Sequence, residues 1–306
     1  MKSAPPVKPA EPLPLWLPTP RSKLDTIAFK TTEIRNIGNP NPTDTRAVKF
    51  TSPRLQAPQL ATGVTYLDMN VNFTYRLDID STDRTTTGFN LAINSWADTV
   101  KYAAGATWFE ISPTDPDFQQ GRSNLYLNMF PPDYKPMSAI KFPRAYTEDV
   151  EILVWLTYLD FSAIKANFIM IDVSVLEANR AGFQLWYGTS GANNCVYGLG
   201  YSWIAYPKSK KGVESGLISK QKISLNTGEV RSIQEVKFKK EFMKPPRVWL
   251  AWSGMEVTNA KADNMRLMTE VVADSTTTTG FKYQIDLKSP VTLGSLSLYW
   301  IAVELD

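Results

Sequence analysis

The sequence predicts an all-β protein made of three tandem antiparallel β-sandwich modules, each with about six strands. Three observations lead to this fold class: a segment that occurs three times, apolar and polar residues that alternate with a period of two, and threonine runs that end in a glycine. Helical periodicity is nearly absent. Short strands at regular spacing, separated by turn signals, are typical of an antiparallel sandwich.

Each of the three repeats carries the same three landmarks in the same order. A tetrapeptide ending in Lys-Phe is followed about forty residues later by a Gly-Phe pair, and about twenty residues after that by a Trp in an apolar stretch. The landmarks are Ala47–Phe50, Gly88–Phe89 and Trp108, then Ala139–Phe142, Gly182–Phe183 and Trp203, then Glu235–Phe238, Gly280–Phe281 and Trp300. Their period of roughly 92 to 98 residues is that of a whole small domain. We therefore expect repeat 1 at 25–117, repeat 2 at 118–212 and repeat 3 at 213–306.

The alternation within the repeats indicates which strand faces are buried. Apolar side chains occupy every second position over residues 73–79 of repeat 1, with polar residues between them. Repeat 3 behaves similarly, with Met265, Leu267 and Val271 against Asn264, Arg266 and Glu270. In repeat 2 the same region has apolar residues on both faces, because Phe168 and Met170 stand where the other repeats are polar. The strands with Trp108, Trp203 and Trp300 are expected to close the modules, with these rings in the core.

The first 24 residues differ in composition from the rest of the chain. Their seven prolines forbid regular strand ladders and favour an extended, polyproline-like arm. Trp16 stands between two leucines, and such an exposed apolar triplet would be unfavourable in water. We expect Trp16 to pack against one of the modules.

The composition argues against several classes of function. The formal net charge of +3 is spread along the chain without a basic stripe, so nucleic acid is not an expected partner. The chain has no histidine, which removes Ser-His-Asp and Cys-His catalytic arrangements and the commonest metal ligand. The single Cys195 cannot form an internal disulfide and has no histidine to activate it, so we interpret it as structural. We expect neither an enzyme, nor a metal site, nor a cofactor.

No stretch has the length and apolar content of a signal peptide or a transmembrane helix. No membrane insertion is expected, and a cytoplasmic location fits best, with non-classical secretion as the alternative. The sequon at Asn72 is then an accident of composition.

Several segments resemble a known family. Gly88–Thr99 with the Thr107–Trp108 ending is similar to the H-type lectin domain, known from snail agglutinins and the C-terminal part of slime-mould discoidins. The segment at 39–42 is similar to fungal members of that family. In repeats 2 and 3 the resemblance rests on 142–146, 155–160, 202–207 and 245–248, together with the shared landmarks.

The resemblance implies a six-stranded sandwich that assembles as a trimer and binds galactose or N-acetylgalactosamine ends of glycans at subunit boundaries. In that family an arginine of one subunit contacts the sugar together with a Trp and a Tyr of the next. Counting from Gly88-Phe89 places these residues at Arg76, Trp96 and Tyr102. Asp44 or Asn39 is then expected to accept hydrogen bonds from sugar hydroxyls, and Ala97 replaces the family's histidine.

Such residue types suit a sugar, because an aromatic plane packs on the ring and a guanidinium donates several hydrogen bonds. Repeat 2 keeps little of the set, with Met170 at the arginine position and Tyr197 one residue out of register. Repeat 3 has Lys288 and Gly294 at the aromatic positions, while Arg266 takes the arginine place if two residues are inserted. Only repeat 1 holds the complete set.

Alternatives remain at this stage. Arg76 would be an ordinary surface charge if it paired with Asp78 or Asp80, and Trp96 could be a core residue. The modules could form a trimer-like unit within one chain, with Arg266 facing Trp96 and Tyr102, or associate between chains as a homo-oligomer. A structural or attachment protein that uses the sandwiches for protein contacts is the alternative function, with Phe168 and Met170 as interface residues. A glycosidase is the least favoured reading, since no carboxylate pair stands out.

Overall fold

The computed structural model describes residues 26–126, 137–162, 168–188, 195–223, 229–259, 264–288 and 291–305. The expected proline-rich arm with Trp16 lies outside these residues, as do the side chains of Phe168 and Cys195. Regular structure in the described ranges consists of 18 strands and one 3-10 turn, η1 (Thr31–Glu33). None of the helical structure found there is long or apolar enough to span a bilayer.

Each repeat contributes six strands, which confirms the predicted all-β class and strand number. Repeat 1 has β1 (Ala28–Lys30), β2 (Thr43–Lys49), β3 (Gln59–Asn70), β4 (Thr74–Thr82), β5 (Gly88–Asn94) and β6 (Lys101–Ile111). Repeat 2 has β7 (Gln119–Tyr126), β8 (Met137–Lys141), β9 (Val150–Ser162), β10 (Phe168–Asn179), β11 (Gly182–Gly188) and β12 (Cys195–Pro207). Repeat 3 has β13 (Val213–Ile223), β14 (Glu229–Lys237), β15 (Arg247–Asn259), β16 (Asn264–Val271), β17 (Gly280–Lys288) and β18 (Val291–Val303).

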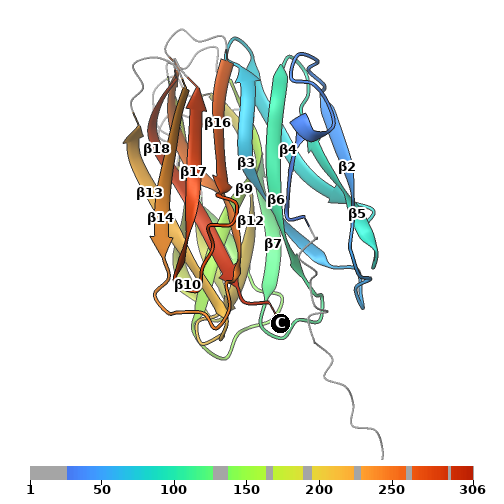
Figure 1. Ribbon diagram of the computed structural model, residues 1–306, viewed down its shortest axis with the longest axis vertical. Coiled ribbons are helices and arrows are strands. Elements are labelled where there is room, and N and C mark those ends of the chain that lie inside the picture. The colour runs from blue at the N-terminus through green and yellow to red at the C-terminus, as the bar shows by residue number, and fades with distance from the viewer. Residues whose placement is uncertain are drawn as a thin grey trace, which may run out of the picture.

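The sheets do not stop at the repeat boundaries. The strands form three antiparallel six-stranded sheets, ordered β1-β6-β3-β16-β17-β14, β13-β18-β15-β10-β11-β8 and β2-β5-β4-β9-β12-β7. Each sheet therefore takes three strands from one repeat and three from the next, and the strands run along the long axis of the molecule (Figure 1). The three repeats close into a trimer-like unit within one chain, one of the two arrangements expected.

The alternating pattern buries the predicted faces. Tyr75, Leu77 and Ile79 of β4 and Met265 and Leu267 of β16 are fully buried. The polar residues between them face outward, and Arg76 and Arg266 are among these residues.

The three sequence landmarks converge in the core of each repeat. In repeat 1 the ring centroids of Phe50 and Phe89 lie 5.9 Å apart, and those of Phe89 and Trp108 lie 5.4 Å apart. The corresponding rings also meet in the other two repeats, as Phe142, Phe183 and Trp203 and as Phe238, Phe281 and Trp300. The core role predicted for the three Trp residues is confirmed.

The glycine of each Gly-Phe pair is required by the neighbouring strand. A Cβ atom on Gly88 would stand 2.1 Å from the carbonyl oxygen of Val48. Gly182 and Gly280 stand in the same relation to Ile140 and Val236. The Gly-Phe pair and the Lys-Phe tetrapeptide therefore recur together because they are paired strand ends.

At the centre of the molecule the repeats are complementary rather than identical. Thr62, Val154 and Leu250 pair with the three landmark Trp residues, so the residues that follow them, Gly63, Trp155 and Ala251, occupy equivalent places. A Cβ atom on Gly63 would lie 2.5 Å from Cβ of Ala251 and 2.8 Å from Cβ of Trp155. The ring of Trp155 fills the space that the small residues Gly63 and Ala251 leave.

Candidate functional site

Arg76 lies where repeats 1 and 2 share a sheet. It is on β4, in register with Asp160 of β9, and its Nε donates to Oδ1 of Asp160 at 3.1 Å. Its Nη1 donates to Asp98, in the loop between β5 and β6, and Asp98 also accepts a 3.2 Å hydrogen bond from the hydroxyl of Thr74. These contacts use two of the five N–H groups of the guanidinium. Arg76 is thus held by carboxylates of two repeats, rather than by Asp78, which pairs with Arg122.

Aromatic rings lie beside this arginine. Trp96 stacks on Tyr158 of β9, with ring centroids 5.5 Å apart and an interplanar angle of 22°. Tyr126 at the end of β7 meets Tyr158 edge to face at 5.1 Å and is 59% exposed. Gly198 of β12 makes room for this group, because a Cβ atom there would lie 2.7 Å from Cε1 of Tyr158. We call Arg76, Trp96, Asp98, Tyr158 and Asp160 the 1/2 boundary cluster.

The burial of this cluster alters its acid–base properties. Burial, and then the negative charge of Asp160, raise the pKa of Tyr158 to about 12. Burial also raises the pKa of Asp160, more than the charge of Arg76 lowers it. Asp98 differs, because hydrogen bonds from Arg76 and Thr74 outweigh the effect of burial and lower its pKa. The cluster therefore presents a protonated phenol and a fixed guanidinium near neutral pH.

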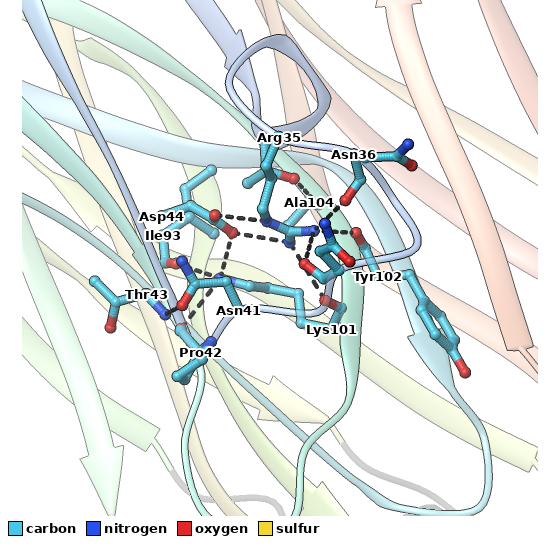
Figure 2. A network of polar contacts seen from close by, with 12 residues as sticks. Arg35, Asn36, Asn41, Pro42, Thr43, Asp44, Ile93, Lys101, Tyr102 and Ala104 are labelled. Carbon is cyan, nitrogen blue, oxygen red and sulfur yellow. Dashed lines mark hydrogen bonds and ion pairs between the residues drawn. The ribbon is translucent and has the colours of Figure 1, made fainter.

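Asp44 lies in the interior, although we expected it to accept hydrogen bonds from a ligand. Its carboxylate, 1% exposed, accepts from Nε and Nη2 of Arg35 at 2.6 and 2.9 Å and pairs with Nζ of Lys101 at 3.1 Å (Figure 2). The Lys101 ammonium also donates to the carbonyl oxygens of Pro42 and Ile93. Burial lowers the pKa of Lys101 to about 8, although Asp44 acts to raise it. This network joins the segment after η1 to β2 and β6, and it leaves Asp44 no exposed oxygen for a ligand.

Asn39 and Tyr102 border the same network. Asn39 is exposed, and its carbonyl oxygen accepts from Nη1 of Arg35 at 3.1 Å. The Tyr102 ring points away from the network (Figure 2), and its hydroxyl accepts a 3.0 Å hydrogen bond from Nδ2 of Asn70. Asn70 is in register with Asn264 of repeat 3. Tyr102 therefore lies on the side of repeat 1 that meets repeat 3, whereas Trp96 contacts repeat 2.

Arg266 repeats the setting of Arg76 at the boundary of repeats 3 and 1. It is on β16 in register with Asp68 of β3, and both its Nε and its Nη2 lie 2.6 Å from Oδ2 of Asp68. At the third boundary, Met170 of β10 is in register with Glu256 of β15. The three boundaries thus present Arg76–Asp160, Arg266–Asp68 and Met170–Glu256 at equivalent positions.

The residues chosen from the sequence therefore do not all lie at one site in the structure. It places Arg76 and Trp96 at the same boundary, places Arg266 at another boundary, and puts Tyr102 on the opposite side of the repeat from Trp96. Sequence reasoning gave no site role to Tyr158, Asp160 and Tyr126, all from repeat 2. The segment 155–160 carried a signal, since it resembled the family, but only the strand register shows that it faces Arg76.

The 1/2 boundary cluster offers groups that can bind a ligand. The described residues hold no group of three or more His, Cys, Asp or Glu side chains placed to ligate a metal. What the 1/2 boundary cluster offers is an aromatic plane, fixed N–H donors and carboxylate acceptors, which together can hold a polar ligand with an apolar face.

Comparisons with known proteins address the family directly. A family model described as the H-type lectin domain matches residues 45–109, 138–206 and 233–303. Similar solved structures include native recombinant discoidin II of Dictyostelium discoideum, with 12% identity over 54% of this chain and 82% of that chain, at a TM-score of 0.26. Wild-type discoidin II from the same organism has 15% identity over 53% and 80% of the two chains, also at a TM-score of 0.26. No curated protein matches the chain.

Proposed function

Because this chain belongs to the H-type lectin domain family, we propose that it binds galactose- or N-acetylgalactosamine-terminated glycans without catalysis, principally through repeat 1. Carbohydrate binding in general follows from the family. The specificity and the place of the site are our proposal, and they rest on the 1/2 boundary cluster.

The observation that carries the proposal is the combination of Trp96 on Tyr158 with Arg76 between two carboxylates. A galactose-type sugar has an apolar ring face that packs on an indole and hydroxyl groups that need rigid donors. Arg76 is pre-oriented by Asp98 and Asp160, so little side-chain entropy is lost when it donates to a sugar. Asp98, at the exposed side of the cluster, replaces the buried Asp44 as the proposed acceptor for sugar hydroxyls.

Replacing Trp96 by Ala tests this proposal. We expect the Trp96→Ala variant to lose binding to galactose- and N-acetylgalactosamine-terminated ligands on a glycan array, by roughly tenfold or more, because the aromatic platform is gone. Trp186→Ala is the matched control, since Trp186 is a similarly half-buried indole on β11 of repeat 2. A Trp96→Ala variant that folds normally and binds as the unmodified chain does would refute the assignment.

The alternative function, a structural or attachment protein, rested on Phe168 and Met170. Met170 is half-buried at the boundary of repeats 2 and 3, in register with Glu256 of the same chain. Met170 thus lies at a boundary inside the chain, a place that does not by itself require an external protein partner.

A further inference from the structure

A cavity of about 500 Å³ lies on the outward face of the sheet that repeats 3 and 1 share. Its walls come from four strands, β3, β16, β17 and β14, and are formed by Tyr66, Arg231, Arg266, Met268, Asp286, Leu287 and Lys288. The cavity therefore combines one aromatic ring, two apolar side chains, three cations and one carboxylate.

Strand register explains why these residues meet. Tyr66 of β3, Met268 of β16, Asp286 of β17 and Arg231 of β14 form one row across the sheet. In the next row, Arg266 lies between Asp68 and Lys288. Alternate residues of a strand face the same side of a sheet, so both rows point into the cavity face.

The carboxylates beside Arg266 and Arg231 are already engaged. Asp68 is fully buried, pairs with Arg266 and accepts from Nδ2 of Asn264 at 2.7 Å. Asp286 accepts from Nε and Nη2 of Arg231 at 2.9 and 3.4 Å. Both guanidiniums are therefore held in position, and the described side chains that line the cavity carry an excess of positive charge.

The equivalent rows at the 1/2 boundary show what has changed. There, Tyr158, Asp78, Asn94 and Thr43 stand in the places of Tyr66, Met268, Asp286 and Arg231. Trp96 lies two residues beyond Asn94, just as Lys288 lies two beyond Asp286. The tyrosine and the arginine with its aspartate partner are retained, while the platform Trp becomes a lysine, Asp78 becomes a methionine and Thr43 becomes an arginine.

These differences replace an aromatic stacking surface with charged side chains. At the 1/2 boundary the five positions of Arg76, Asp78, Asn94, Trp96 and Thr43 carry one positive and one negative charge. Their counterparts Arg266, Met268, Asp286, Lys288 and Arg231 carry three positive charges and one negative. Guanidinium groups form paired hydrogen bonds to carboxylates and to sulfate-type oxyanions, and an ammonium adds a further donor.

We propose that this cavity binds an acidic sugar, a glycan end that bears a carboxylate or a sulfate ester. Arg231, Arg266 and Lys288 receive the anion, and Tyr66 and Met268 contact the sugar ring. The inference rests on the proposed lectin function and adds a second specificity. One chain then binds a neutral sugar at one boundary and an acidic sugar at another.

The test uses the whole chain and three soluble probes: methyl galactoside, galactose 3-sulfate and the methyl glycoside of N-acetylneuraminic acid. The two acidic probes separate a sulfate from a carboxylate preference. We expect at least one of them to bind, and Lys288→Gln and Arg231→Gln each to weaken it by roughly tenfold in calorimetric titration, because each removes a charge-assisted hydrogen bond. Lys282→Gln is the control, since Lys282 is exposed on the same strand outside the cavity lining.

The outcomes separate this inference from the proposed function. Failure of both acidic probes to bind, or an equal loss in the Lys282→Gln control, would overturn the acidic site. Methyl galactoside binding that needs Trp96 would in either case still support the proposed function. Acidic binding that survives Trp96→Ala but not Lys288→Gln supports two distinct sites.

Discussion

At the scale of single residues, the buried Lys101 is the group with the clearest consequence for stability. Its ammonium has three acceptors, Asp44 and the carbonyl oxygens of Pro42 and Ile93, so it is fully hydrogen-bonded inside the protein (Figure 2). Burial nevertheless lowers its pKa to about 8 from the ordinary value of 10.5. The charged form is therefore less favourable in the folded chain than in the unfolded one.

The lowered pKa of Lys101 determines the direction in which the free energy of unfolding changes with pH. Between pH 8 and 10.5 the unfolded chain binds more protons at Lys101 than the folded chain does, so stability rises with pH there. We expect this group to add up to about 2–3 kcal/mol to the free energy of unfolding between pH 8 and 10, measured by urea denaturation. Above pH 10 the buried tyrosines act in the opposite sense, because their raised pKa values stabilise the fold only while the phenols are protonated.

The control for that measurement is Lys101→Met. This variant is expected to be less stable at every pH, since the buried carboxylate of Asp44 and the carbonyl oxygen of Ile93 lose a donor. Its free energy of unfolding should lack the rise between pH 8 and 10. An equal rise in both proteins would assign the effect to other groups.

At the scale of strands, the recurring Gly-Phe pair can be tested through its contact with the neighbouring strand. Gly88→Ala would place Cβ 2.1 Å from the carbonyl oxygen of Val48, which is backbone and cannot rotate away. We expect a loss of about 1–3 kcal/mol in the free energy of unfolding. Gly38→Ala is a suitable control, because the nearest atom to its Cβ would be 3.7 Å away. Equal stability of the two variants would show that the paired strand ends tolerate a side chain.

The strand scale also shows what the sequence could predict. Period-two alternation and the landmarks were sufficient for strand number and core residues, because both depend on local pattern and on burial. They could not predict that each repeat splits into two half-sheets shared with its neighbours. Edge pairing such as β4 with β9 depends on backbone groups that every residue carries, so it leaves little trace in composition.

The same limit applies to the candidate site. Arg76 and Trp96 could be chosen from the family resemblance, but Asp160, the partner of Arg76, and Tyr158, the partner of Trp96, each lie more than sixty residues away along the chain. Asp44 was a reasonable acceptor by type and position, yet whether a carboxylate faces solvent depends on Arg35 and Lys101, which contact it only in the folded chain. The type of a polar residue indicates which interactions its side chain can make. It does not indicate whether that side chain is exposed to solvent in the folded chain.

At the scale of the whole molecule, the centre explains why three different repeats occur in one chain. Gly63, Trp155 and Ala251 occupy equivalent places and differ greatly in volume. Three copies of Trp155 would overfill this space, and three copies of Gly63 would leave it hollow. The repeats have therefore specialised for one another, which also lets each boundary carry its own side chains.

This specialisation predicts an energetic coupling between repeats 1 and 3. Gly63→Ala places its Cβ 2.5 Å from Cβ of Ala251 and 2.8 Å from Cβ of Trp155, and we expect it to lower the free energy of unfolding by about 1–3 kcal/mol. Adding Ala251→Gly removes the closer of the two clashes, so the double variant should recover part of the loss. A double-mutant cycle of urea denaturation measures this recovery as a coupling free energy of about 0.5 kcal/mol or more. Strictly additive losses would mean that the two residues do not meet, and that repeats 1 and 3 are not packed together at the centre of the molecule.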